Sequence, residues 1–123
     1  MKTICTERQN HARDYLKENC FDEYDGIICV GGDGMFSEIS FSILLKTMKQ
    51  HHLNINEKNV QLIPSRIRLG IIPCGSTDGL VYNTTGHNHP QTSALQIITG
   101  QSILIDKSTV IKIDFLFEEL FFL

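Results

Sequence analysis

The stretch Asp25-Gly-Ile-Ile-Cys-Val-Gly-Gly-Asp-Gly34 constrains the fold more than any other part of the chain. Its four apolar residues, Ile27–Val30, form a short run rich in β-branched side chains, which is typical of a strand buried on both faces of a parallel sheet. The run breaks into three glycines around one aspartate, and apolar residues at helical spacing begin directly afterwards. A strand, a glycine-rich turn and a helix in this order present backbone N–H groups and a helix N-terminus to a phosphate.

Two acidic residues accompany this turn. Asp33 lies inside it, where a carboxylate beside bound phosphate is electrostatically unfavourable unless it serves chemistry or a metal. Asp33, in either role, is therefore a first indication of a phosphoryl-transfer site. Glu38 falls in the first turn of the following helix, which we expect to reach about Gln50. Glu38 has two interpretations: it complements the helix dipole, or it orients Asp33 or a metal-bound water.

A second strand, turn and helix follow later in the chain. Arg68–Pro73 is another candidate for a buried strand, and Cys74-Gly-Ser-Thr-Asp78 leads from it into a helix. Ser76, Thr77 or Asp78 could cap that helix. Because parallel strands place their carboxyl ends at one edge of a sheet, we expect the two turns to converge on one ligand. The predicted fold is α/β, with a doubly wound, mostly parallel sheet and helices on both faces.

The N-terminal residues predict a short strand over Lys2–Thr6 and an amphipathic helix from Glu7 to about Asn19. Thr6 has two interpretations. It caps this helix, or, at the carboxyl end of a strand, it also faces a ligand.

The remaining segments are less informative about function. Residues 51–66 and 83–90 predict loops, and a short helix is expected from Pro90 until Gly100 stops it. Ser102–Asp106 and Thr109–Asp114 read as strands, and the final residues are unusually rich in Phe and Leu.

Composition excludes several classes of protein. A length of 123 residues allows one domain at most, and a net charge of −3 without a basic stripe makes nucleic acid an improbable partner. The four cysteines form no CxxC pair, which favours a reduced, cytoplasmic protein. No apolar run approaches the ~20 residues of a transmembrane helix. The histidine pairs have no third ligand at suitable spacing, so no protein metal centre is expected.

Three segments together resemble the catalytic domain of the diacylglycerol-kinase-type lipid kinases: DGIICVGGDGMFSEI (Asp25–Ile39), IRLGIIPCGSTD (Ile67–Asp78) and TSALQIITG (Thr92–Gly100). Within that family they are most similar to the branch that phosphorylates ceramide, and sphingosine kinases share Thr6-Glu-Arg8. NAD kinases and phosphofructokinases share only the Gly-Gly-Asp-Gly turn. The resemblance implies a partial catalytic, ATP-binding domain over residues 1–110 and an atypical apolar tail over residues 111–123.

The resemblance implies ATP- and Mg²⁺-dependent phosphorylation of the primary hydroxyl of a sphingolipid, foremost ceramide, with the membrane surface met only through the lipid. Asp33 is then the general base for the attacking hydroxyl. The nucleotide-binding positions are implied to be Thr6, Gly31, Gly32, Gly34, Glu38, Gly75, Ser76 and Thr77. The expected location is cytoplasmic, peripheral at membranes.

The chain also departs from the family pattern. Such kinases begin with a strand and an Asn-Pro, glycine-rich phosphate loop, and they continue into a β-rich second domain, neither of which is recognisable here. The sheet should therefore be incomplete, and we expect the isolated chain to bind ATP weakly and to phosphorylate ceramide little or not at all. Two alternatives stay open: a truncated, non-catalytic fragment or interaction module, and a small-molecule kinase of the NAD-kinase type.

Overall fold

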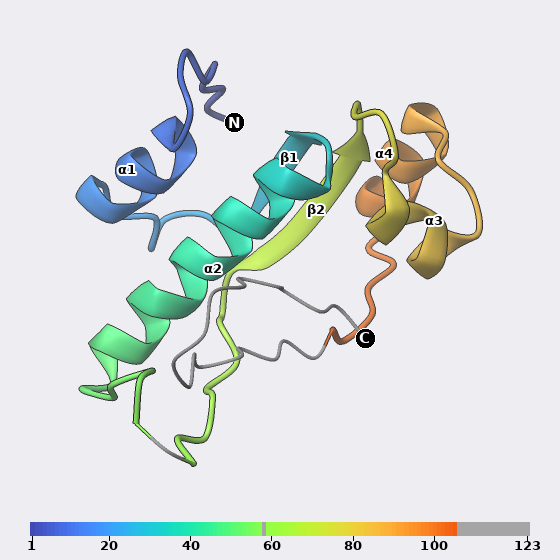
Figure 1. The fold of residues 1–123 in the computed structure, drawn as a ribbon. Helices are drawn as coiled ribbons and strands as arrows, with labels where there is room; N and C mark the ends of the chain where they lie inside the picture. The colour runs from blue at the N-terminus through green and yellow to red at the C-terminus, as the bar shows by residue number, and fades with distance from the viewer. Residues whose placement is uncertain (58, 106–123) are drawn as a thin grey trace, which may run out of the picture.

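The computed structural model, which describes residues 1–57 and 59–105, is a small α/β fold built on two parallel strands (Figure 1). In chain order its elements are α1 (His11–Glu18), β1 (Gly26–Gly31), α2 (Asp33–Gln50), β2 (Arg68–Pro73), α3 (Gly79–Thr85) and α4 (Pro90–Ile98). The register places Gly26 opposite Arg68 and Gly31 opposite Pro73. The parallel pairing of the two predicted strands is confirmed. Within the described residues the sheet has these two strands, so the α/β fold is incomplete and the doubly wound sheet stays a prediction.

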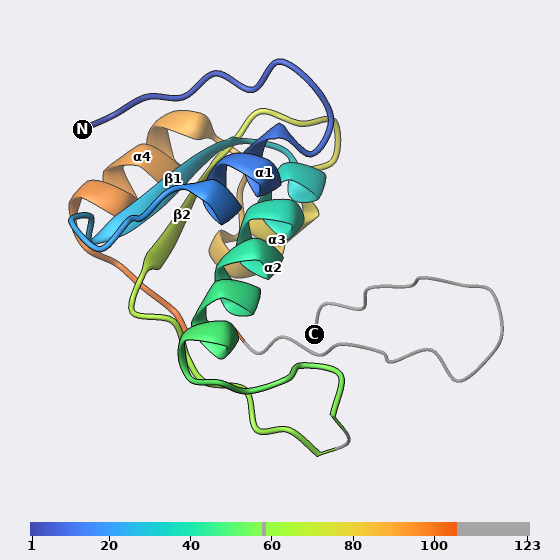
Figure 2. The same cartoon turned by 90° about the vertical axis from the view of Figure 1, so that its left-hand side faces the viewer.

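Helices cover both faces of the sheet (Figures 1 and 2). On one face Cys29 of β1 packs in a core cluster with Phe36 and Ile39 of α2. On the other face α4 packs against β2, and a Cβ added to Gly70 would come within 2.9 Å of Ile97 Cδ1. Side chains that alternate along a strand point to opposite faces, which explains why neighbouring residues meet different helices.

The expectation that β1 is buried on both faces is wrong. Cys29 is 1% exposed, but Ile28 is 46% exposed and Val30 is 60% exposed. The apolar run is continuous because both faces of β1 carry apolar side chains. On the face that carries Ile28 and Val30, however, α4 packs over β2, and β1 stays exposed within the described part of the chain.

The chain ends also differ from the prediction. Lys2–Thr6 forms no strand, and α1 begins at His11 rather than Glu7, so Thr6 is not its N-cap. The N-cap position belongs to Asn10, which adopts the left-handed conformation with φ 59° that Asn tolerates well. Ser102 to Ile105 are exposed and form no strand. The predicted strand Thr109–Asp114, Asp106 and the apolar tail 111–123 lie outside the described residues.

The predicted helix around Gly79 is present, but it runs to Thr85 and so takes in the start of the loop expected over residues 83–90. Gly86 ends it with φ 80°, a conformation that favours glycine. Pro90 opens α4, and Gly100 follows that helix with φ 74°, so both predicted ends of α4 are confirmed. Within the described residues, no helix is both long enough and apolar enough to cross a membrane.

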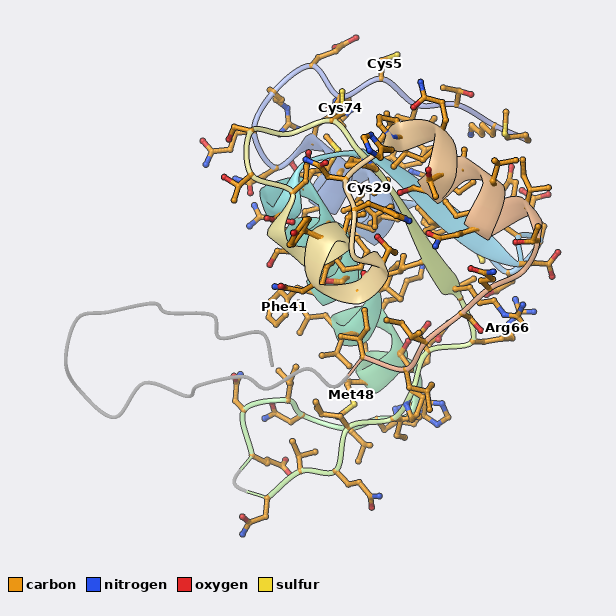
Figure 3. The ribbon with its side chains drawn as sticks, turned by 90° about the vertical axis from the view of Figure 1, so that its right-hand side faces the viewer. Cys5, Cys29, Phe41, Met48, Arg66 and Cys74 are labelled. Carbon is orange, nitrogen blue, oxygen red and sulfur yellow. The ribbon has the colours of Figure 1, made fainter. Side chains whose placement is uncertain are left out.

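All four cysteines lie in the described part of the chain and are free thiols. Figure 3 shows Cys29 inside the molecule, Cys74 on the turn after β2 and Cys5 on the outer N-terminal segment. Burial, with a smaller contribution from the charge of Glu38, raises the pKa of the Cys29 thiol from 9.0 to about 11. Cys29 is therefore a packing residue and stays protonated at neutral pH.

We expect Cys5, Cys20 and Cys74 to react rapidly with a thiol reagent at pH 8, because all three are exposed. Cys29 should react ~100-fold more slowly, which corresponds to an opening free energy of about 3 kcal/mol for the core. Counting modified thiols by mass spectrometry over time measures this difference. Equal reaction of all four thiols in the folded protein would contradict the core described above.

Candidate functional site

The two glycine-rich turns are in direct contact at one edge of the sheet. A Cβ added to Gly75 would lie 2.7 Å from Gly32 Cα, and one added to Gly32 would lie 3.1 Å from Gly75 Cα. The backbone N–H of Cys74 also donates to the carbonyl of Gly31, at 3.1 Å. Glycine at both positions is what lets the two backbones approach this closely. The turns after β1 and β2 therefore meet, as the order of the strands and turns predicts.

Asp33 joins the two turns through its side chain. Its Oδ2 accepts a hydrogen bond from the backbone N–H of Gly79, at 2.8 Å, and its Oδ1 accepts one from Leu80, at 3.1 Å. Asp33 is the first residue of α2 rather than a member of the turn, and its carboxylate caps the N-terminus of α3. Charge-assisted hydrogen bonds of this kind are about twice as strong as neutral ones. The N-termini of α2 and α3 are thus bridged by one carboxylate.

Asp78, one of the three candidates for the cap of α3, is its N-cap residue, but its side chain makes no capping hydrogen bond to that helix. Both of its carboxylate oxygens accept from the backbone N–H of Gly75 instead, at 3.0 and 3.2 Å. Asp78 is 6% exposed, and it stabilises the second turn from within. Ser76 and Thr77 are exposed on the outside of that turn. Asp side chains hydrogen-bond backbone groups three or four residues earlier in the chain, so the spacing of Gly75 and Asp78 could have indicated this role.

The N-terminus of α2 offers backbone donors beside the contact between the turns. Its first helical hydrogen bond runs from Phe36 N–H to the carbonyl of Gly32, at 3.2 Å, so the three preceding N–H groups have no partner within the helix. Gly34 is exposed, and a Cβ built there meets no atom within 4 Å apart from the helix's own backbone. An 18-residue helix adds the positive end of its dipole at this point. The arrangement suits a phosphate.

The Glu38 side chain is hydrogen-bonded to α1 and to neither turn among the described residues. Its Oε1 accepts a hydrogen bond from the backbone N–H of Arg13, at 2.9 Å, in the first turn of α1. Its charge also contributes to the raised pKa of the Cys29 thiol, for which burial is the main cause. Glu38 therefore performs for α1 the capping function that Asp33 performs for α3.

Thr6 lies in the exposed segment before α1, and no hydrogen bond found among residues 1–57 and 59–105 joins it to Gly31–Gly34 or to Gly75–Asp78. Of the expected site residues, the structure gathers Gly31, Gly32, Asp33, Gly34, Gly75, Ser76 and Thr77. The Glu38 side chain is hydrogen-bonded to α1 instead, and Thr6 makes no hydrogen bond to either turn within the described residues.

A nucleotide-bound Mg²⁺ fits the residues at this site. Among the described residues no group of three or more His, Cys, Asp or Glu side chains could hold a metal ion by itself. Mg²⁺ is commonly held by one or two carboxylates together with substrate phosphates, so a protein cage is not required. Each oxygen of Asp33 accepts one backbone hydrogen bond and keeps further lone-pair capacity.

Comparison with known proteins identifies the family to which this chain is similar. The diacylglycerol kinase catalytic domain matches residues 1–110. Ceramide kinase from Mus musculus is 49% identical over 107 residues, which cover 87% of this chain and 20% of the mouse protein. Ceramide kinase from Homo sapiens is 46% identical over the same length and with the same coverage.

A more distant relative, ceramide kinase 1 from Caenorhabditis elegans, is 38% identical over 112 residues, or 89% of this chain and 20% of that protein. The chain thus spans about a fifth of the length of these relatives. No solved structure matches it.

Proposed function

Because the chain belongs to the diacylglycerol kinase catalytic domain family, we propose that its two joined turns bind the phosphates of ATP in a lipid kinase. The observation that carries this proposal is the contact between Gly32 and Gly75, which places two glycine-rich turns and two helix N-termini together. Backbone N–H groups at such a point stabilise phosphate oxygens without covalent chemistry, and phosphoryl transfer depends mainly on positioning and charge stabilisation.

We assign the phosphate contacts to the backbone of Gly31, Gly32 and Gly34, and to the Gly75-Ser-Thr77 turn. Gly34 is exposed and has open space above it, so the nucleotide can approach the first turn of α2 closely. Ser76 and Thr77 are exposed on the second turn, and their hydroxyls can donate to phosphate oxygens. Mg²⁺ bound to the nucleotide offsets part of the phosphate charge that Asp33 faces.

Asp33 is the proposed general base. Its two hydrogen bonds to α3 fix the carboxylate at the meeting point of the turns, and its remaining lone pairs can accept a proton from the attacking hydroxyl. The proton moves from the hydroxyl to a carboxylate oxygen as the new oxygen–phosphorus bond forms, while the bond from the γ-phosphorus to the bridging oxygen breaks and ADP leaves. Orientation by α3 is the reason a single short side chain can serve this step.

The proposed acceptor is the primary hydroxyl of a sphingolipid, with ceramide as the first candidate, because the relatives named above are ceramide kinases. The family match favours a lipid acceptor over NAD. The chain covers about a fifth of those relatives, so we assign it the phosphate-binding turns and the proposed base, and we expect it to bind ATP weakly on its own.

Titration calorimetry with ATP and Mg²⁺ tests the proposal. We expect Gly34→Asp to weaken ATP binding at least about tenfold, since it places a carboxylate where the phosphates approach. Gln61→Glu adds the same charge on an exposed loop and is the matched control. Equal ATP affinity of Gly34→Asp and wild type would contradict the assignment of the phosphate site.

A further inference from the structure

Strand β1 has an open edge. The carbonyls of Asp25 and Gly31 accept from backbone N–H groups at the start of β2 and just after its end. Because backbone groups of alternate residues point to opposite edges of a strand, the odd-numbered residues of β1 face β2. The N–H and carbonyl groups of Ile28 and Val30 therefore point away from it. Within the part of the chain that the structure describes, the sheet ends at β1 and no strand pairs with these groups.

The same two residues also expose apolar side chains. Ile28 and Val30 are the exposed members of the apolar run, whereas Cys29 between them is buried in the core cluster beneath α2. An edge that combines free backbone groups with apolar side chains is a template for another strand. β1 thus offers both kinds of contact that a third strand makes.

The helices indicate where a third parallel strand would lie. A connection from a strand through a helix to a parallel strand of the same sheet is right-handed in about 98% of cases. The connection from β1 to β2 passes through α2 on one face, and α4 packs against β2 on the other face (Figures 1 and 2). Right-handed connections on opposite faces step in opposite directions across a sheet. A strand after α4 therefore steps from β2 back past β1, and the first free position is the open edge of β1.

The sequence supplies one candidate for this position. Besides β1 and β2, three segments have the pattern of a strand: Lys2–Thr6, Ser102–Asp106 and Thr109–Asp114. The first lies before α1 and forms no strand, and the second forms none over its described residues. Thr109–Asp114 comes after α4 in the chain and lies outside the described residues. It is the segment that the order of the elements favours.

The side chains of Thr109–Asp114 suit an edge strand. Alternation in a strand puts Thr109, Ile111 and Ile113 on one side and Val110, Lys112 and Asp114 on the other. The side with two isoleucines matches the exposed apolar side chains of β1. A lysine in the middle of a strand is typical of sheet edges, because its charge discourages pairing with a further chain.

The connection is long enough for this path. Residues 99–108 link the end of α4 to Thr109, and an extended chain spans about 3.3 Å per residue. Neighbouring strands are only about 4.8 Å apart, so the connection can cross from β2 past β1 and still turn.

We propose that Thr109–Asp114 pairs in parallel with the open edge of β1 and becomes the third strand of the sheet, with β1 in the centre. The backbone groups of Ile28 and Val30 are then paired, and Ile111 and Ile113 cover their side chains. The contact lies within one chain. It concerns an edge of the sheet that the proposed phosphate site does not use, so it stands or falls independently of ATP binding.

Amide hydrogen exchange on the full chain tests the pairing. We expect Ile111→Asp to speed exchange at Ile28 and Val30 by about tenfold or more, because a carboxylate on the apolar side opens the edge. The amides of Ile27 and Cys29 face β2 and should keep their protection, which makes them the internal reference. Ile103→Asp adds the same charge at an exposed isoleucine outside the strand and is the matched control.

Two exchange results would overturn the proposal. One is an Ile28 and a Val30 amide that exchange as fast as free amides in the wild type. The other is protection of these amides that Ile111→Asp leaves unchanged, since another segment would then cover the edge.

Nuclear Overhauser contacts in the wild-type chain decide the matter even if Ile111→Asp loosens the whole sheet. We expect contacts from the Val30 side chain to those of Ile111 and Ile113. A mixture of isotope-labelled and unlabelled chains should show none of them between copies. Contacts between copies, or an absence of contacts within the chain, would overturn the proposal.

Discussion

Gly75→Ala should lower the free energy of unfolding by about 2 kcal/mol or more and should separate the two turns. The added Cβ would lie 2.7 Å from Gly32 Cα and 2.8 Å from Asp78 Oδ1, closer than real Cβ atoms approach. One neighbour is backbone and the other a buried carboxylate, so relief requires moving the turn, and forced packing of this kind costs roughly 1–3 kcal/mol. Urea unfolding measures the loss, and ATP binding should fall with it.

Gly34→Ala is the matched control for stability. Its Cβ enters open space, and Ala is favoured over Gly in a helix, so the urea midpoint should be unchanged or slightly higher. If Gly75→Ala proved as stable as Gly34→Ala, the close contact between the turns would not exist in solution.

Asp33→Ala should destabilise the chain by about 2–3 kcal/mol, independently of any catalytic role. The substitution leaves the backbone N–H groups of Gly79 and Leu80 without their partner, and losing a charged acceptor costs about that much. The stability of Asp33→Asn should lie between those of the wild type and Asp33→Ala. The Asn amide keeps one acceptor oxygen, but its NH₂ group then faces the second backbone N–H group. Urea unfolding measures the loss of stability in both variants. The slope of the unfolding free energy against urea concentration should be the same as in the wild type.

The consequence for enzymology is that Asp33→Asn is not a pure base substitution. If Asp33 acted only as a base, both variants would match the wild type in stability and in exchange at Gly79 and Leu80. We expect faster exchange at those two amides, with α1 unaffected because Glu38 holds it separately. Wild-type protection at Gly79 and Leu80 in Asp33→Ala would contradict the bridge between α2 and α3.

Local pattern predicted the frame of the fold well. The apolar runs at Ile27–Val30 and Arg68–Pro73 are strands, they pair in parallel, and the glycine-rich turns after them meet. These features follow from short-range chemistry: β-branched runs, glycines where backbones approach, and proline at a helix start. The failed strand at Lys2–Thr6 had no such support beyond its composition.

Helix capping was the part that sequence could not provide. Local rules assign each cap to a residue next to the helix, so they pointed to Thr6 for α1 and to the Ser76–Asp78 turn for α3. In the structure both caps come from α2, across 25 residues for Glu38 and 46 residues for Asp33. Asn10 and Asp78 take left-handed conformations at the N-cap positions, and a pairing over that distance depends on how the helices pack.

In the proposed function, the two turns act as a single phosphate-binding unit. Amide NMR spectra of the chain, recorded during titration with ATP and Mg²⁺, test this most directly. We predict saturable shifts at Gly31–Gly34 and at Gly75–Leu80 that follow one dissociation constant. Shifts confined to one turn, or centred on another part of the molecule while both turns stay unmoved, would contradict it.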